Sequence, residues 1–242
     1  MTKNKSLAES IQDLRRISQG VEVEKTIHPV YPGIKKKAPK APFLLTKELF
    51  WKLFNFYAPA SYTLNQSNQT VIFTVMRYFI KDVQFNEYGL VKNLPSLDKG
   101  LLIYGSNGVG KSLLFEILHK VGKELITKAN CNDVWFSCIS AGSFVDEYMR
   151  AAQDKDNSEV FDLKNFYHGQ LYIDDLGFEK KAFNKNELLG EILFERNRKK
   201  AKTFATTNLK PSQITDRYGD RIGDRLPEMF NIINWNGESF RK

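Results

Sequence analysis

The chain has 242 residues, of which 42% are hydrophobic and 26% charged, a composition that excludes a wholly disordered chain and allows one or two domains with a sizeable core. No apolar run approaches the roughly 20 residues that span a bilayer, which excludes an integral membrane protein, and two cysteines are too few for a disulfide scaffold. The N-terminus lacks the apolar core of a signal peptide, so we expect a cytoplasmic protein. The formal net charge of +8 has two readings, an attraction to polyanions or a simple aid to solubility.

The first 43 residues differ in composition from the rest of the chain. Residues 6–17 predict a short amphipathic helix, because apolar side chains recur at helical spacing at Leu7, Ile11, Leu14 and Ile17. A segment rich in proline and lysine follows, which is typical of an extended arm. Residues 1–40 hold nine basic and four acidic side chains, so more than half of the net charge lies in this arm.

Two regular patterns follow the arm. Residues 46–58 and 66–81 each predict a helix with a strong apolar face, within a helical segment spanning 44–97. From residue 98 to 242, short apolar runs alternate with helical patterns. The runs that predict strands are 100–104, 134–139, 169–173, 203–206 and 231–235, and the helical patterns between them are 111–121, 143–152 and 186–199. This alternation predicts an α/β domain with a five-stranded parallel sheet and right-handed crossovers.

A glycine-rich motif joins the first predicted strand to the helix after it. The sequence GSNGVGKS matches the phosphate-loop pattern G-x-x-x-x-G-K-[ST]. Its glycines let backbone N–H groups surround a phosphate, its lysine reaches the β- and γ-phosphates, and its serine hydroxyl ligates Mg²⁺. The strand before and the helix after the motif disfavour the alternative of a ligand-free turn. We therefore predict an ATP·Mg²⁺ site at Gly105, Ser106, Asn107, Gly108, Val109, Gly110, Lys111 and Ser112.

Two adjacent carboxylates end the third predicted strand. In LYIDD, Asp174 is the expected Mg²⁺ partner and Asp175 the group that orients the attacking water. Alone, the pair could equally be an acidic turn. Its position after a phosphate loop favours the catalytic interpretation.

Together these motifs resemble the AAA+ ATPases of the DnaC/IstB-like group, which includes replicative helicase loaders. The resemblance covers about 98–242 and rests on GLLIYGSNGVGKS, LYIDDLGFE, TFATTNL, RYGDRIGDRL and NWNGESFRK. It implies a five-stranded parallel sheet between helices, without a separate C-terminal lid domain. It also implies a polar sensor at Asn208, an arginine finger at Arg225 with Arg221 as the competing choice, and a second arginine sensor at Arg241.

The resemblance further implies a slow ATPase, stimulated by DNA or a partner, that loads a replicative helicase onto single-stranded DNA and assembles with its own copies through Arg225. Two alternatives stay open: an IstB-type transposition helper, and an ATP-gated adaptor without hydrolysis. Possible DNA contacts are Arg196, Arg198, Lys199, Lys200, Lys202, Phe144 and Tyr148, although a solvated helix end and core packing are the favoured alternatives for them. Cys138 is expected to be a core thiol.

Overall fold

The structure is a computed structural model that describes residues 43–153 and 161–239. The predicted helix at 6–17, most of the basic arm and Arg241 lie outside these residues. Five strands form one parallel sheet in the order β2-β3-β4-β1-β5, which confirms the predicted α/β fold. The strands are β1 (Gly100–Tyr104), β2 (Ser137–Ser140), β3 (Leu171–Asp174), β4 (Thr203–Thr207) and β5 (Phe230–Asn234).

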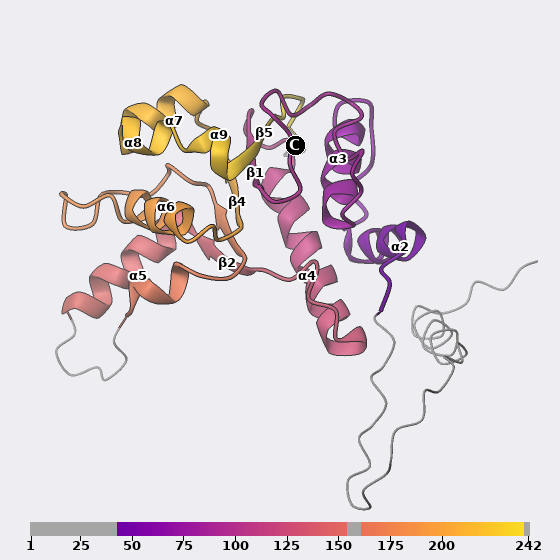
Figure 1. Cartoon of the computed structure of the whole chain (residues 1–242), viewed down its shortest axis with the longest axis horizontal. Helices are drawn as coiled ribbons and strands as arrows, with labels where there is room; N and C mark the ends of the chain where they lie inside the picture. The colour runs from indigo at the N-terminus through magenta and orange to yellow at the C-terminus, as the bar shows by residue number, and fades with distance from the viewer. Residues whose placement is uncertain (1–42, 154–160, 240–242) are drawn as a thin grey trace, which may run out of the picture.

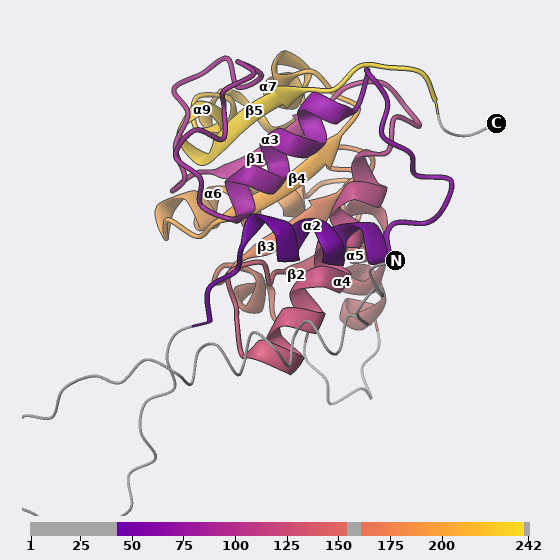
Figure 2. The ribbon, with the colours of Figure 1, turned by 90° about the vertical axis from the view of Figure 1, so that its right-hand side faces the viewer.

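Helices cover both faces of the sheet (Figure 1, Figure 2). One face carries α2 (Lys47–Tyr57), α3 (Gln69–Phe79) and α4 (Lys111–Ala129). The other carries the 3₁₀ helix η1 (Leu163–Phe166), α5 (Ala141–Gln153), α6 (Leu188–Arg198), α7 (Pro211–Tyr218), α8 (Asp220–Gly223) and α9 (Leu226–Met229). Because both faces are covered, the interior strand β1 is apolar on both sides: Leu101 and Ile103 face one cluster, and Leu102 faces the other.

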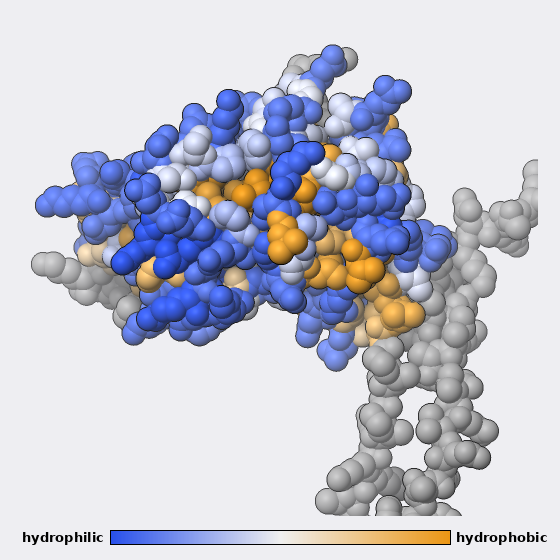
Figure 3. All heavy atoms as spheres, turned by 45° about the horizontal axis from the view of Figure 1, so that its top comes forward, coloured by the Kyte–Doolittle hydropathy of each residue, from blue (hydrophilic) through white to orange (hydrophobic). Residues whose placement is uncertain are grey.

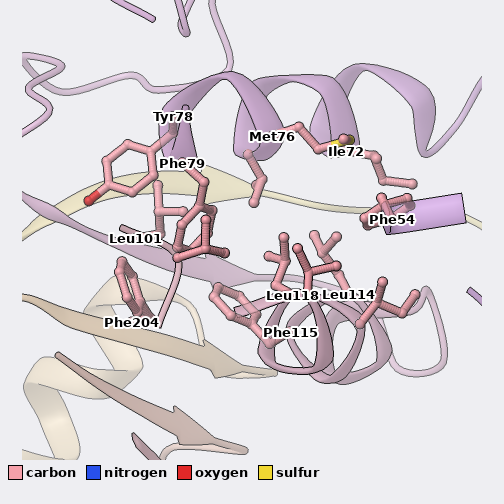
Figure 4. Packing of buried hydrophobic residues seen from close by; sticks show 14 of the residues in the cluster. Phe54, Ile72, Met76, Tyr78, Phe79, Leu101, Leu114, Phe115, Leu118 and Phe204 are labelled. Carbon is pink, nitrogen blue, oxygen red and sulfur yellow. The ribbon is translucent and has the colours of Figure 1, made fainter. Parts of the chain in front are cut away.

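The predicted N-terminal helices share a core with the sheet. In Figure 4, Ile72, Met76 and Phe79 of α3 point toward Leu114, Phe115 and Leu118 of α4. Phe79 is 3% exposed, and its ring lies 5.2 Å from that of Phe204 in β4. Truncating such a buried ring costs about 3–5 kcal/mol, so α3 is an integral part of this core.

The outer sides of α2 and α3 leave an apolar groove. Its volume is about 430 Å³, and its lining includes Trp51, Phe73, Met76, Ile80 and Tyr88. Figure 3 shows hydrophobic atoms gathered on this side of the molecule. Within 43–153 and 161–239, none of the helices combines the length and apolar character needed to cross a bilayer.

The prediction of a core thiol at Cys138 is wrong, because Cys138 is exposed on β2. β2 lies at one edge of the sheet and pairs only with β3. The apolar residues that suggested a buried strand, Val134 and Phe136, come before the paired segment and are fully buried there. The edge position therefore exposes the strand, while the loop ahead of it enters the core.

Arg196 holds parts of the chain together and is fully buried, so the prediction that it contacts DNA is wrong. Its side chain is fully buried on α6 and has five acceptors. They are the backbone oxygens of Phe166, His168, Gly169 and Lys202, at 2.6–3.1 Å, and Thr203 Oγ1 at 2.8 Å. These bonds tie the start of β3 to the start of β4. Burial lowers the pKa of Arg196, yet the five oxygen acceptors stabilise its cationic form.

Two other possible DNA contacts are also occupied within the fold. The Lys202 ammonium donates to the backbone oxygen of Leu97 at 2.7 Å and lies 5.7 Å from the ring centre of Tyr78. Phe144 is 3% exposed and packs against Phe166, as the alternative of core packing predicted. Of the cations considered at the end of α6, Arg198, Lys199 and Lys200 are exposed.

Candidate active site

The phosphate-loop motif lies at the carboxyl end of β1, between β4 and β5 in the sheet. Gly105, Gly108 and Gly110 have φ values of +144°, +78° and +96°, in the region that favours glycine. A Cβ at Gly105 would lie 2.0 Å from the backbone oxygen of Trp235, and one at Gly108 would lie 2.1 Å from Ser239 Oγ. The loop is therefore closely covered by the segment after β5, and α4 begins directly behind it at Lys111.

Lys111 turns its side chain back into this loop and is only 5% exposed. Its ammonium donates to the backbone oxygens of Gly105 and Ser106 at 3.0 and 2.8 Å, and to Asn208 Oδ1 at 2.8 Å. Asn208 directly follows β4, so two neighbouring strands bring these polar groups together. The geometry presents a cation to any anion that enters the loop.

Asp174 is the last residue of β3 and has two hydroxyl donors. Tyr172 OH and Thr206 Oγ1 each donate to Asp174 Oδ1 at 2.6 Å. Burial, the charge of Asp174 and the hydrogen bond to it raise the pKa of Tyr172 well above its ordinary value. Tyr172 therefore stays a neutral donor that fixes the carboxylate. Ser112 contributes a further side-chain hydrogen bond to Tyr172, which joins the phosphate-loop serine to the same cluster.

Asp175 begins the turn after β3 with a φ of +52°. A residue other than glycine in this region costs about 1–3 kcal/mol and persists only where its surroundings hold it. Its backbone N–H donates to Thr206 Oγ1 at 3.3 Å, and the next N–H, of Leu176, donates to the backbone oxygen of Thr206 at 2.8 Å. β4 thus fixes the direction in which this carboxylate leaves the sheet.

A cavity of about 570 Å³ opens beside the phosphate loop. Its lining comprises Tyr104, Gly105, Ser106, Asn107, Asn208, Lys210, Pro211, Ser212, Asn234 and Asn236. The cavity lies at the carboxyl edge of the sheet, where β1 stands between β4 and β5 and where α/β proteins bind ligands. Its volume falls within the range of ordinary ligand pockets, about 300–1,000 Å³.

The two candidate finger arginines lie away from this cavity. Arg221 belongs to α8, and Arg225 follows it just before α9. Both guanidinium carbons lie 5.0 Å from the ring centre of Phe194 on α6, and Arg225 also donates to the backbone oxygen of Arg221. Figure 1 shows α8 at the left end of the molecule, whereas the loop between β1 and α4 lies near its middle. Neither arginine lines the cavity beside their own phosphate loop.

Two groups at the site went unnoticed in the sequence. Tyr172 and Thr206 hold Asp174, yet each reads as an ordinary strand residue. A weak signal exists for Tyr172, because side chains two positions apart on a strand share a face and Tyr172 precedes Asp174 by two. The position of Thr206 could not be foreseen without the pairing of β3 with β4.

The residues present fit a nucleotide with a divalent cation. The loop glycines open a cradle that side chains would fill, Lys111 supplies a positive charge, and Asp174 with Ser112 offers the oxygen donors that Mg²⁺ prefers. A loop of this kind after an interior strand, with acidic and polar residues at the ends of β3 and β4, defines a P-loop ATPase of the AAA+ class.

The chain belongs to the family of the bacterial DnaA ATPase domain, whose model matches residues 91–232. It is 26% identical over 121 residues to the replicative helicase loader DnaI of Bacillus subtilis (strain 168), covering 50% of this chain and 36% of that one. It is 24% identical over 133 residues to the chromosomal replication initiator protein DnaA of Buchnera aphidicola subsp. Cinara cedri (strain Cc), covering 54% and 29%. The matches thus span about a third of the length of these relatives.

A solved structure shares the fold. The crystal structure of the DnaC helicase loader superposes with a TM-score of 0.50 at 20% identity, covering 78% of this chain and 99% of that one. The predicted membership of the AAA+ class, with its likeness to helicase loaders, is confirmed.

Proposed function

We propose that this protein binds and hydrolyses ATP and loads a replicative helicase onto single-stranded DNA, in the cytoplasm. The observation that carries the ATPase part is the position of Lys111. Its buried ammonium lies 2.8 Å from Asn208 Oδ1 at the mouth of a glycine-lined loop. The helicase-loading part rests on the family match and on the likeness to DnaI, whose name describes such a loader.

Each residue of the site has a role in this proposal. Lys111 exchanges its contacts with the loop carbonyls for phosphate oxygens, and the N–H groups from Gly105 to Ser112 surround the phosphates. Ser112 and Asp174 would hold Mg²⁺, which neutralises charge on the β- and γ-phosphates when bound. Asp175 orients the attacking water, and Asn208 holds the γ-phosphate or that water. Arg241 would reach the subunit's own nucleotide.

Arg225 completes the site of a neighbouring subunit. Its guanidinium carbon lies 5.0 Å from the ring centre of Phe194 on α6, and Arg225 does not line the cavity beside its own loop. An arginine supplied in trans stabilises the charge that develops during phosphoryl transfer. Hydrolysis then requires assembly of several copies. Arg221, at the same distance from Phe194, remains the competing choice.

The loop after Asp175 is the surface best suited to single-stranded DNA. Phe178 and Phe183 are 81% and 43% exposed, and lysines stand between and beside them at 180, 181 and 185. Bases stack on exposed aromatic rings, and lysines attract the phosphate backbone, whatever the base sequence of the DNA. Tyr148, considered for DNA from the sequence, lies 6.3 Å from the ring of Phe183 and extends this surface.

The decisive experiment measures ATP turnover with and without single-stranded DNA, together with co-purification of the replicative helicase. We expect slow turnover that DNA or helicase stimulates, loss of turnover in Asp175→Ala, and little change in the matched control Asp98→Ala, whose exposed carboxylate precedes β1. ATP binding without stimulated turnover would favour the non-hydrolysing adaptor. Recovery of a transposase instead of a helicase would favour the transposition helper.

The DNA surface has its own test. Phe178→Ala should weaken single-stranded DNA binding by roughly tenfold or more, because stacking of one base contributes about 1–3 kcal/mol. The matched control is Phe56→Ala, since Phe56 is 63% exposed on α2, on the opposite face of the sheet. Equal affinities for both variants would place the DNA elsewhere.

A further inference from the structure

A buried carboxylate links the turn of Asp175 to the helix ahead of Arg225. Glu179 is 3% exposed, although it lies four residues beyond the catalytic carboxylate on a loop. Glutamate is seldom buried to this extent without strong partners. What surrounds its two oxygens therefore shows which parts of the chain it holds together.

One oxygen of Glu179 holds the turn. The backbone N–H of Gly177 donates to Glu179 Oε2 at 2.9 Å. Gly177 has a φ of +92°, and the N–H of Phe178 closes the turn by donating to the backbone oxygen of Asp175 at 3.0 Å. The carboxylate thus braces the same turn whose left-handed first residue is Asp175.

The other oxygen of Glu179 holds α7. Tyr218 OH donates to Glu179 Oε1, and the Arg217 guanidinium lies 3.3 Å from the same atom. Burial, together with the charge of Glu179, raises the pKa of Tyr218 well above its ordinary value, so Tyr218 remains a donor. Two consecutive residues at the end of α7 are therefore fixed to one carboxylate.

Arg217 doubles this connection through the backbone. Its guanidinium donates to the backbone oxygen of Gly177 at 2.7 Å and to that of Glu179. It also lies 3.4 Å from Glu187 Oε2, at the start of α6. A charge-assisted hydrogen bond to a buried group is about twice as strong as a neutral one, so the turn and α7 are expected to move together.

α7 in turn packs against α8, the helix that precedes the arginine proposed to act in trans. α8 packs closely against α7, because a Cβ on Gly223 would lie 2.3 Å from Thr215 Oγ1. Arg225 follows α8 directly, with its guanidinium over Phe194. A chain of packed contacts therefore runs from the turn at Asp175 to the guanidinium of Arg225.

We propose that Glu179 is a positioning residue that couples the turn holding Asp175 in one subunit to the orientation of the Arg225 that this subunit presents to its neighbour. The proposal rests on the proposed ATPase with a finger in trans. Loss of the Glu179 carboxylate would then have two separable effects. The effect on the turn of Asp175 appears in the subunit's own site, and the effect on Arg225 appears in the site of the neighbouring subunit.

The test uses assemblies mixed from two kinds of full-length subunit on single-stranded DNA. Acceptor subunits carry Arg225→Ala and keep their own site, whereas donor subunits carry Asp175→Ala and keep their finger, so turnover arises where a donor faces an acceptor. Adding Glu179→Gln to the donor alone should lower kcat roughly 10- to 100-fold with an unchanged KM for ATP, because small misplacements of catalytic groups cost this much. An unchanged kcat overturns the proposal.

Two further variants separate positioning from loss of structure. Tyr218→Phe in the donor removes a single donor to Glu179 and should lower kcat in the same sense by a smaller factor. Glu116→Gln, an exposed glutamate on α4, should leave kcat unchanged in the donor. If Glu116→Gln lowered kcat as much as Tyr218→Phe does, the effect of Glu179→Gln would be general destabilisation and the coupling would be rejected.

A second measurement does not depend on turnover. Amide hydrogen exchange across residues 211–225 is compared before and after a non-hydrolysable ATP analogue is added to the unaltered protein and to Glu179→Gln. We expect a change in exchange in the unaltered protein that Glu179→Gln removes. No change in the unaltered protein overturns the coupling even if the protein is an active ATPase. If the mixed assemblies are inactive but exchange responds as expected, the coupling stands and the finger in trans is rejected.

Discussion

Two buried cations lie at opposite edges of the sheet and differ in the groups that accept their hydrogen bonds. Lys111, 5% exposed at the carboxyl edge, contacts two oxygens of a glycine loop and the side chain of Asn208, beside a cavity. Arg196, fully buried at the amino edge, contacts four backbone oxygens and Thr203. In the proposed ATPase, phosphate oxygens take the place of the loop oxygens that Lys111 contacts. The acceptors of Arg196 hold the chain itself, so burial of a charge alone does not indicate a functional site.

The largest expected effect is a loss of folding stability when Arg196 is replaced. Arg196→Met should lower the free energy of unfolding by about 3–5 kcal/mol, because it leaves buried backbone oxygens without donors. Urea denaturation measures this. The matched control is Arg198→Met, two residues along the same helix and exposed, which should change stability by about 0.5 kcal/mol or less. Similar losses in both would remove the distinction drawn for Arg196.

For Lys111 we expect the reverse: its replacement should affect ATP binding far more than folding stability. Lys111→Met should weaken ATP binding by roughly 100-fold or more, because a charge-assisted contact to the phosphates is lost. Its unfolding transition should stay close to that of the unaltered protein, since Gly105, Ser106 and Asn208, which supply the acceptors, line a cavity. Calorimetry measures both quantities. A loss of stability as large as that of Arg196→Met would show that Lys111 also serves the fold.

A smaller effect is expected in the dependence of folding stability on pH, through the buried Tyr78. Burial, with the charge of Asp98 adding to it, raises the pKa of Tyr78, whose hydroxyl donates to the backbone oxygen of Lys99. The folded form keeps this proton above pH ~10, where the unfolded chain loses it, so its contribution to stability is complete below pH ~10 and falls as pH rises further. Urea denaturation at pH 9, 10 and 11 should show this fall, with a shallower slope in Tyr78→Phe. Equal slopes would mean that Tyr78 does not contribute to it.

The sequence predicted those parts of the site that depend on local pattern. The phosphate loop needs glycines, a lysine and a serine at fixed spacing, and the five apolar runs mark the five strands. What escaped depends on pairing across the sheet. Thr206 reaches Asp174 only because β4 lies beside β3, and Arg196 resembles its exposed neighbours in every local respect.

Cys138 illustrates the same limit. An apolar run predicts burial, but the position of a strand within the sheet decides it, and β2 lies at the edge. Glu179 is the opposite case, since a glutamate in a loop predicts exposure, whereas Arg217 and Tyr218 enclose it. In both residues the environment comes from segments far along the chain.

The place of β1 between β4 and β5 also has a consequence for folding during synthesis. β1 pairs with β4 and β5, and Asn231 bonds to Gly100 across 131 residues of chain. While the ribosome is still making the second half, the strand before the phosphate loop has no partner, and its apolar residues remain open to wrong associations. Contacts this distant in sequence make folding slow and favour aggregation of the unfinished chain. A nascent chain that lacks β4 and β5 should therefore depend on chaperones. Binding of ATP should not stabilise such a chain, because the strand before the phosphate loop is still unpaired.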